Sequence, residues 1–375
     1  MNDWKRKLLR QIADFLDAPR MDRLEFLRSP LRLLSLPYRG VVEFRRLAYR
    51  FMEKETFHCR VISIGSISFG GSGKTPVTLE LASRAERSGH RAAIVTSGYG
   101  GNRKAQPILV FDGKKILSTV GAAGDEAVMM ARRLNRQGMS CLVIADRIRP
   151  RAIRLALANG CDLVLLDDAF HCLNIRKDLD IILLRPQDVS PFQALIPAGS
   201  LREPLDSIRY ADILWLCDFP KENDSPPRKA LARIEPHGSI IESRSAIARI
   251  YTYPEMKEVS LHSLSASRFL AFAGLARPQA FFDRLKEKSI PVGCEMAFPD
   301  HFLYGKSDLR ELERTALHQG CDALITTEKD IVKVPSDWES RIPLYMTELS
   351  IELARVSLAA PLQTGILADL KIVDV

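Results

Sequence analysis

The stretch that decides the fold runs Arg60-Val-Ile-Ser-Ile-Gly-Ser-Ile-Ser-Phe-Gly-Gly-Ser-Gly-Lys-Thr-Pro76. Its first part, residues 61–64, is a short apolar run that predicts a buried strand. A glycine-rich turn follows, and a helical pattern opens at Gly73, Lys74 and Thr75. In a phosphate-binding loop, glycines let backbone N–H groups and a helix N-terminus surround phosphate oxygens. The stretch therefore predicts a site for a nucleoside triphosphate.

Several residues of this loop have an expected part in binding. Lys74 would reach the terminal phosphates and Thr75 would ligate Mg²⁺. The usual pattern G-x-x-x-x-G-K-S/T is incomplete, because Ser68 stands at the first glycine position. The motif alone leaves open a glycine-rich turn with a surface lysine. The residues expected to bind the nucleotide are Gly70, Gly71, Ser72, Gly73, Lys74, Thr75 and Pro76.

Composition favours a two-domain protein of the reducing cytosol. The chain has 375 residues, 46% of them hydrophobic, and domains usually hold about 100–200 residues. A signal peptide and a transmembrane helix are not expected, because no apolar run of the needed length occurs. The seven cysteines are scattered and odd in number, which favours free thiols over a disulfide or zinc framework.

Positive charge gathers near the N-terminus. The net charge is +8, and residues 1–54 hold thirteen Lys and Arg against seven Asp and Glu, an excess of six. Apolar residues such as Trp4, Leu8, Ile12 and Phe15 recur there at helical spacing. Such a segment can lie on an anionic membrane or pack its apolar face on the protein's own core, and both remain open. No nucleic-acid partner is expected.

The remaining pattern predicts an α/β fold, because short apolar strands alternate with helices, as in mostly parallel sheets covered on both faces. Strands are expected at 91–96, 141–145, 162–166, 180–184 and 213–216, and helices at 77–87, 126–135 and 149–159. A second strand–helix series is expected at 269–273, 278–288, 292–297, 306–319 and 323–326.

The organisation predicted from this pattern has three parts. The polar, proline-rich residues 220–228 mark a boundary or long loop, and residues 239–253 are expected to form an extended ribbon. We expect a basic N-terminal segment at 1–54, a phosphate-loop core at 55–235 and a smaller α/β domain with its linker at 236–375.

Two adjacent carboxylates follow an apolar run at residues 163–166. Ligands in parallel sheets bind beyond the carboxyl ends of the strands, so Asp167 or Asp168 is expected to hold Mg²⁺. The alternative is a pair of solvated acids at a strand end. Asp125 stands at a turn-to-helix junction, where it could cap the helix or accept a proton from an attacking hydroxyl.

Other candidate residues lie in loops. His301 is a lone histidine in a loop of the second domain, where a hydrogen-bonded or surface role is the common one. Arg202 and Glu203 stand side by side, and the arginine could bind an anionic group or belong to a surface turn. Residues 327–330, TEKD, partly match the guanine-reading order N-K-x-D, but the lysine falls one place late.

Together these motifs resemble the tetraacyldisaccharide 4′-kinase family, the lipid A kinases of Gram-negative bacteria, over roughly residues 60–335. They occur in the family's order. The matching segments are 70–76 (GGSGKTP), 97–101 (SGYGG), 124–126 (GDE), 145–147 (ADR), 167–168 (DD), 197–199 (PAG), 201–204 (LREP), 271–274 (AFAG), 300–301 (DH) and 327–330 (TEKD).

The resemblance implies a kinase that uses ATP and Mg²⁺ to phosphorylate the 4′-hydroxyl of a tetraacylated glucosamine disaccharide 1-phosphate. It also implies a P-loop core and a smaller α/β domain joined by a two-stranded linker. The N-terminal helix would rest on the cytoplasmic face of the bacterial inner membrane, as in a peripheral protein.

Residue roles also follow from the resemblance. Asp125 and His301 match a dyad that activates the sugar hydroxyl, and Arg147 matches an arginine near the reacting phosphate. The residues that match the lipid substrate site are Tyr99, Arg202 and Glu203.

One segment departs from the family. Where the family usually has D-D-G-F-Q-H, this chain has Asp167-Asp-Ala-Phe-His-Cys172. His171 stands at the glutamine place and Cys172 at the histidine place, so a histidine contact to the substrate would have to come from His171. Two other functions stay open: a membrane-associated P-loop nucleotide switch without kinase activity, and a kinase for a small soluble substrate.

Overall fold

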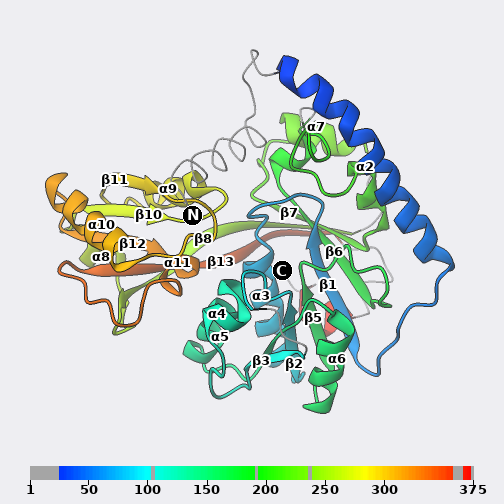
Figure 1. The fold of residues 1–375 in the computed structure, drawn as a ribbon, viewed down its shortest axis with the longest axis horizontal. Coiled ribbons are helices and arrows are strands. Elements are labelled where there is room, and N and C mark those ends of the chain that lie inside the picture. The colour runs from blue at the N-terminus through cyan, green and yellow to red at the C-terminus, as the bar shows by residue number, and fades with distance from the viewer. Residues whose placement is uncertain (1–24, 103–105, 191–192, 235–238, 358–365, 373–375) are drawn as a thin grey trace.

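The computed structural model describes residues 25–102, 106–190, 193–234, 239–357 and 366–372. The first part of the predicted N-terminal amphipathic pattern, with Trp4 and Ile12, lies outside these residues. Within the described residues, a single sheet runs through two lobes (Figure 1). Helix α2 (Glu25–Phe51) lies along the larger lobe.

The larger lobe is built on strands in the order β7-β6-β1-β5-β2-β4-β3. These strands are β1 (Arg60–Ser66), β2 (Ala92–Thr96), β3 (Ile108–Phe111), β4 (Leu142–Ala145), β5 (Leu163–Asp167), β6 (Leu179–Leu184) and β7 (Ile213–Cys217). They run parallel except β3, an edge strand that the sequence did not predict and that pairs antiparallel with β4. Strands β2, β4, β5 and β7 are buried at every residue.

Helices cover both faces of this part of the sheet. Helices α3 (Lys74–Arg87) and α5 (Asp125–Arg136) pack on one face. Helices α6 (Arg149–Ala158) and α7 (Pro226–Ala232) pack on the other. The predicted α/β class, a mostly parallel sheet between two helical layers, is therefore confirmed. The loop predicted at 220–228 is wrong for its last three residues, because Pro226 and Pro227 begin α7, and proline is favoured in a first helical turn.

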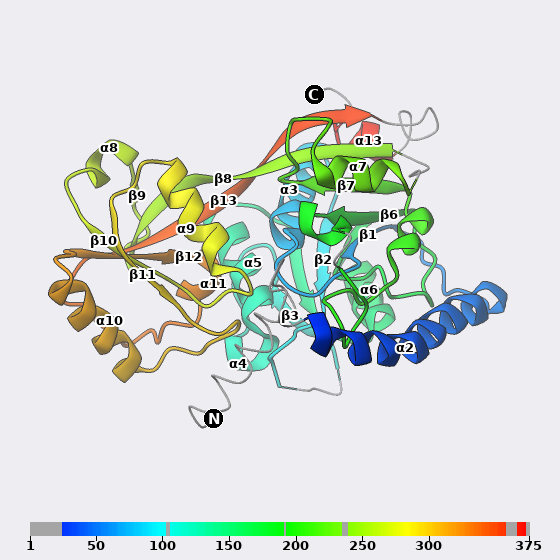
Figure 2. The same cartoon turned by 90° about the horizontal axis from the view of Figure 1, so that it is seen from above.

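A long antiparallel ribbon connects the lobes. Strand β8 (Ser239–Tyr253) pairs with β7 in the larger lobe and with β13 (Leu344–Ser357) along most of its length. Strand β13 in turn pairs with β12 of the smaller lobe, so the sheet continues without a break (Figure 2). The ribbon predicted at 239–253 is confirmed. The sequence did not indicate β13, because irregularities at Glu348/Leu349 and Leu353/Arg355 interrupt its alternation.

The smaller lobe continues the sheet in the order β11-β10-β12-β13. Its further elements are β9 (Glu258–Val259), β10 (Phe269–Ala273), β11 (Val292–Ala297), β12 (Ala323–Thr327), α8 (Leu261–Leu264), α9 (Pro278–Glu287), α10 (Lys306–His318) and α11 (Glu328–Ile331). Helix α9 packs on one face, and α10 with α11 on the other. The predicted second strand–helix series is confirmed. Helix α13 (Ile366–Asp369) packs back on the larger lobe.

A buried ion-pair network holds the smaller lobe against α5. Arg133 and Arg136 of α5 both pair with Glu328 of α11 and Glu348 of β13. None of the four side chains is more than 15% exposed. Removing one member of a buried pair leaves a charge without its partner, which commonly costs about 3–5 kcal/mol. The network therefore stabilises the arrangement in which the smaller lobe contacts α5.

Helix α2 turns its polar side inward. The Ser35 hydroxyl donates to the Leu195 carbonyl and the Tyr38 hydroxyl to the Arg202 carbonyl, both at 2.8 Å. Arg46 donates to the buried carboxylate of Glu203 at 2.8 Å. These contacts attach the helix to the loop that follows β6.

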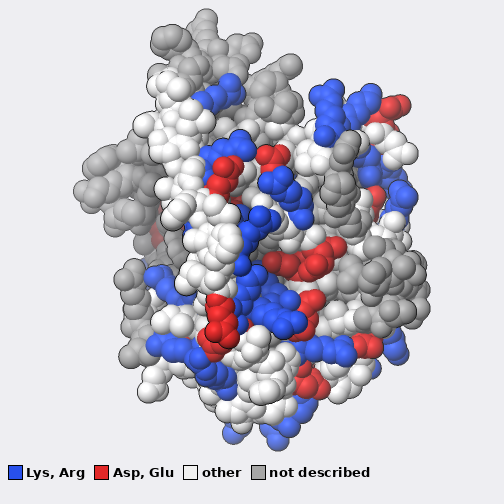
Figure 3. Space-filling model, turned by 90° about the vertical axis from the view of Figure 1, so that its right-hand side faces the viewer, with Lys and Arg blue, Asp and Glu red and all other residues white. Residues whose placement is uncertain are grey.

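The apolar side of α2 faces outward. Its exposed apolar residues are Leu33, Leu34, Leu36, Val41, Phe44, Leu47 and Phe51, with exposed fractions between 50% and 85%. Figure 3 shows this side of the molecule, where a band of uncharged side chains runs beside a cluster of Lys and Arg. The alternative in which this apolar face packs on the protein's own core is therefore wrong for the described part of the helix. Among the described helices, none has the length and apolar character that crossing a bilayer requires.

The turn before α5 depends on a glycine, which allows a sharp test. Gly124 has a φ of 87°, and a Cβ there would lie 2.2 Å from the Tyr99 carbonyl oxygen. We expect Gly124→Ala to lower the free energy of unfolding by at least about 2 kcal/mol, because both the backbone conformation and the contact exclude a side chain. Urea denaturation followed by circular dichroism measures the loss.

Gly121→Ala is the matched control, three residues earlier in α4 (Val120–Ala123). A Cβ at Gly121 meets nothing within 4 Å, and alanine favours a helix over glycine. The control should therefore be neutral or slightly stabilising, and an equal loss in both variants would contradict the steric explanation.

Candidate functional site

The phosphate loop joins β1 to α3, as the sequence predicts. Gly70 and Gly73 have φ values of 81° and 82°, a region that residues with side chains rarely adopt. The Lys74 ammonium donates to the hydroxyls of Ser66 and Ser72 at 3.0 and 2.9 Å. It also lies 3.5 Å from a carboxylate oxygen of Asp168. The lysine is thus held over the loop, at the carboxyl end of the parallel strands.

Arg185 supports this loop, and the sequence did not single it out. Its guanidinium donates to the Gly71 carbonyl at 2.7 Å and to the Ser68 hydroxyl at 3.3 Å. Asp188 pairs with Arg185 at 3.1 Å, and both side chains are buried. Ser68, at the incomplete position of the motif, is itself fully buried. The one sequence signal for Arg185 is a charge directly after the apolar strand at 179–184.

Asp167 ends β5 and is buried in the larger lobe. Its carboxylate accepts a hydrogen bond from Thr78 at 3.2 Å. Burial, together with the nearby charges of Glu126 and Asp168, raises the pKa of Asp167 to about 7. Thr78, one turn beyond Thr75 on α3, is the threonine that contacts this carboxylate.

Asp168 has the opposite electrostatic environment. Burial alone would raise its pKa, but Lys74 and Arg202 hold the pKa well below its usual value. Arg202 donates to both carboxylate oxygens of Asp168, at 3.0 and 2.7 Å. The pKa values of these two neighbouring carboxylates are therefore shifted in opposite directions, because one is enclosed by the sheet and the other meets two cations.

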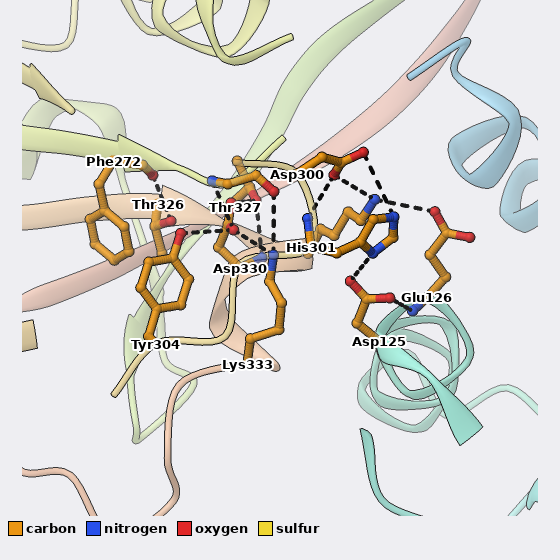
Figure 4. Close-up of polar contacts among 12 residues, drawn as sticks. Asp125, Glu126, Phe272, Asp300, His301, Tyr304, Thr326, Thr327, Asp330 and Lys333 are labelled. Carbon is orange, nitrogen blue, oxygen red and sulfur yellow. Dashed lines mark hydrogen bonds and ion pairs between the residues drawn. The ribbon is translucent and has the colours of Figure 1, made fainter. Parts of the chain in front are cut away.

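Asp125 and His301 meet across the lobe boundary. His301 Nδ1 lies 2.8 Å from Asp125 Oδ2 (Figure 4). Burial would raise the pKa of Asp125, but the hydrogen bond with His301 and the charge of Lys329 lower it. Asp125 does not cap the helix, because the N-cap of α5 is Gly124 and no side chain caps it.

Three further residues surround this pair. The Tyr99 ring lies 5.2 Å from the His301 ring, centroid to centroid, and Tyr99 is 59% exposed. The Lys329 ammonium lies 3.2 Å from a carboxylate oxygen of Glu126. After burial, the charge of Glu126 is also a cause of the raised pKa of Asp167.

The remaining predicted residues lie outside these two groups or at their edge. Arg147 is exposed after β4, and no hydrogen bond or ion pair links it to another described residue. His171 is also exposed, beyond the end of β5. Glu203 is buried beneath α2, where it pairs with Arg45 and Arg46. Its visible role is to hold the helix.

The comparison with protein families settles which family this is. Residues 27–366 match the family model described as tetraacyldisaccharide-1-P 4′-kinase. The chain belongs to this family. Membership favours a kinase over the alternative of a P-loop nucleotide switch.

Relatives and a solved structure agree with this result. A tetraacyldisaccharide 4′-kinase of Desulfatibacillum aliphaticivorans is 34% identical over 333 residues, which cover 86% of this chain and 88% of the relative. One of Syntrophus aciditrophicus (strain SB) is 34% identical over 90% of this chain and 91% of the relative. The "apo" form of LpxK from Aquifex aeolicus, in a crystal structure in complex with ATP, matches with a TM-score of 0.67 and 28% identity, over 88% of this chain and 96% of that one.

The raised pKa of Asp167 predicts how stability changes with pH. The folded protein keeps a proton that the unfolded chain releases near pH 4, so the stabilisation is full below pH 4 and is lost as the pH rises through about 7. Asp167→Asn carries no charge to bury. We expect its advantage in unfolding free energy over the unsubstituted protein to grow by about 2 kcal/mol between pH 5 and pH 8.

Urea denaturation at both pH values, without nucleotide or magnesium, measures this change. Asp168→Asn should behave oppositely and be less stable than the unsubstituted protein at both pH values, because it loses the ion pair with Arg202. A constant difference between Asp167→Asn and the unsubstituted protein across this range would show that Asp167 is ionised throughout.

Proposed function

We propose that this protein transfers the γ-phosphate of ATP to the 4′-hydroxyl of a tetraacylated glucosamine disaccharide 1-phosphate. The observation that carries the proposal is the Asp125–His301 pair, 2.8 Å apart, in a chain that holds a phosphate loop and belongs to this kinase family. The loop supplies a donor site, and the pair supplies a group that can accept the hydroxyl proton.

The donor side depends on positioning and charge rather than on covalent chemistry with the protein. Phosphoryl transfer needs the reacting groups in line and the developing charge neutralised. Lys74 and the N-terminus of α3 suit the phosphates of ATP, and Arg185 keeps the loop in place. Arg147, which is exposed near the carboxyl end of β4, is the proposed further cation at the reacting phosphate.

The residues at the end of β5 fit Mg²⁺. Asp167 and Asp168 are adjacent carboxylates. Burial and the charges of Glu126 and Asp168 raise the pKa of Asp167, and a divalent cation relieves such repulsion between carboxylates. Within the described residues, no three His, Cys, Asp or Glu side chains form a metal cage. Mg²⁺ usually binds one or two carboxylates together with substrate phosphates. We assign Asp167, Asp168 and Thr75 to hold the ion, which would neutralise phosphate charge.

On the acceptor side, Asp125 is the proposed base. Its lowered pKa keeps it ionised at neutral pH, so it can take the proton of the attacking 4′-hydroxyl. The new O–P bond forms at the γ-phosphorus while the bond to the β-phosphate oxygen breaks and ADP leaves. His301 shares the proton of Asp125 through Nδ1 and fixes the direction of the carboxylate.

The lipid would approach along the membrane side of the molecule. We propose that the outward apolar face of α2 rests in the cytoplasmic face of the inner membrane, because a helix with apolar and basic sides binds an anionic lipid surface. Tyr99, His171 and Arg202 are the proposed contacts to the disaccharide. Glu203, the fourth predicted contact, would act by holding α2 beside them.

A division of labour follows from this arrangement. We propose that residues 55–235 bind the nucleotide, residues 236–375 bring His301 to the acceptor, and residues 1–54 provide the membrane contact. Closure of the smaller lobe over the bound substrates would exclude water from the reaction.

Asp125→Asn tests the proposed base. We expect phosphate transfer to fall about 10²–10⁴-fold, because an amide cannot accept the hydroxyl proton. ATP affinity should stay the same, since Asp125 does not line the phosphate loop. Transfer of radiolabelled γ-phosphate to the acylated disaccharide gives the rate, and equilibrium binding of ATP gives the affinity. Unchanged transfer in this variant would exclude Asp125 as the base.

Two substitutions on α2 test the membrane contact. Leu33 and Phe44 are 69% and 72% exposed, and we expect Leu33→Glu with Phe44→Glu to lower the vesicle-bound fraction about tenfold or more. Co-sedimentation with vesicles of phosphatidylethanolamine and phosphatidylglycerol measures binding. Leu317→Glu, at a residue 58% exposed on α10, is the matched control. Equal binding by all three proteins would contradict the assignment of α2 as the contact.

A further inference from the structure

Lys329 bridges the two lobes beside the Asp125–His301 pair. Its ammonium lies 3.2 Å from Glu126 Oε1 and 3.3 Å from Asp300 Oδ1. Glu126 belongs to α5 of the larger lobe, whereas Asp300 belongs to the loop after β11 in the smaller lobe (Figure 4). The Lys329 side chain is only 19% exposed, so this contact is more than a solvated surface ion pair.

Each residue whose carboxylate binds Lys329 also makes a hydrogen bond with one member of the pair. Asp300 Oδ1, the atom that faces Lys329, accepts the backbone N–H of His301 at 3.0 Å. The backbone N–H of Glu126 donates to Asp125 Oδ1, also at 3.0 Å. The contacts therefore form a closed ring through all five residues, with the His301–Asp125 hydrogen bond on one side and Lys329 on the other.

The backbone at His301 needs such support. Its φ is 57°, in the left-handed region that non-glycine residues seldom occupy. A residue in this conformation keeps it only when its surroundings hold it there. Asp300 supplies one such restraint through the N–H of His301, and Lys329 in turn fixes the Asp300 carboxylate.

The backbone that carries Lys329 is anchored by a buried neighbouring residue. The next residue, Asp330, is fully buried and accepts hydrogen bonds from the Tyr304 hydroxyl and the Gly274 N–H, both at 3.0 Å. It also pairs with the buried Lys333 at 2.8 Å. Because Tyr304 follows His301 closely in the same loop, one buried carboxylate anchors both the loop and the helix that carries Lys329.

We propose that Lys329 is a positioning residue for phosphate transfer, whose ammonium holds His301 on Asp125 across the lobe boundary. The proposal rests on the proposed function, because it assigns Lys329 an effect through the proposed base. It goes beyond that function, because neither the phosphate loop nor the Asp125–His301 pair assigns Lys329 a role in the reaction.

Charge gives the proposal a second consequence. The groups that face Asp125 are His301 from the smaller lobe's loop, Lys329 and Lys333 from the α11 region, and Glu126 from its own helix. Removing the positive charge of Lys329 raises the pKa of Asp125, because an opposite charge that favours the carboxylate is lost. A base with a higher pKa is protonated at higher pH, so the acidic limb of the pH–rate profile moves upward.

Lys329→Met tests both consequences with the full chain. We expect kcat for transfer to the acylated disaccharide to fall about 10–100-fold, with KM for ATP unchanged within about twofold. The acidic limb should move up by about half a pH unit or more. Lys329→Arg, which keeps the charge, should recover most of the rate. Lys306→Met is the matched control, because Lys306 makes a 2.6 Å ion pair with Asp337 inside the smaller lobe, away from the boundary.

A spectroscopic readout separates this proposal from the proposed function. The ¹⁵N chemical shift of His301 Nδ1 reports its hydrogen bond with Asp125 without any substrate. Loss of that bond in Lys329→Met, but not in Lys306→Met, supports the positioning role of Lys329 even if the acceptor is a different alcohol. Unaltered His301 shift, kcat and pH profile in Lys329→Met would overturn it. A loss of ATP affinity in Lys329→Met as large as its loss of kcat would also overturn the proposal, because it would indicate a general folding role.

Discussion

The pairing of β8 with β13 is the constraint on which the rest of the molecule depends. These two strands belong to both lobes, so the parallel sheet that carries the phosphate loop and the sheet that carries His301 are one sheet. Arg133 and Arg136 add a buried ion-pair network with Glu348 on the ribbon itself. Because a buried charge without its partner is costly, this network favours the arrangement in which the lobes are in contact and His301 lies 2.8 Å from Asp125.

Much of the fold could be predicted because buried strands occur in the sequence as short apolar or alternating runs. Strand β5 is apolar throughout before its aspartates, and β8 alternates clearly. Strand β13 could not be found in the same way, since its bulges move side chains to the opposite face. Asp125 and His301 lie 176 residues apart, so their pairing followed from family resemblance and not from spacing. Arg185 and Lys329 act through contacts that exist only in the folded chain, and no local pattern marks them.

Helix α2 shows how the exposed apolar surface is coupled to the phosphate loop. An ordinary surface helix buries its apolar side, whereas α2 is fastened by Ser35, Tyr38 and Arg46. Tyr38 binds the backbone of Arg202, and the Arg202 side chain binds Asp168 next to Lys74. Two successive contacts therefore connect the helix with the end of β5.

Positive and negative side chains of the site occupy different places. Lys74, Arg185 and Arg202 gather on the nucleotide side, where phosphate oxygens need cations. Asp125 and Glu126 stand at the start of α5, where a helix N-terminus favours carboxylates. Lys329 lies behind them and compensates for their charge without entering the phosphate loop. Asp125 can thus remain ionised in a protein that also holds a phosphate loop, because His301 and Lys329 offset the cost of its burial.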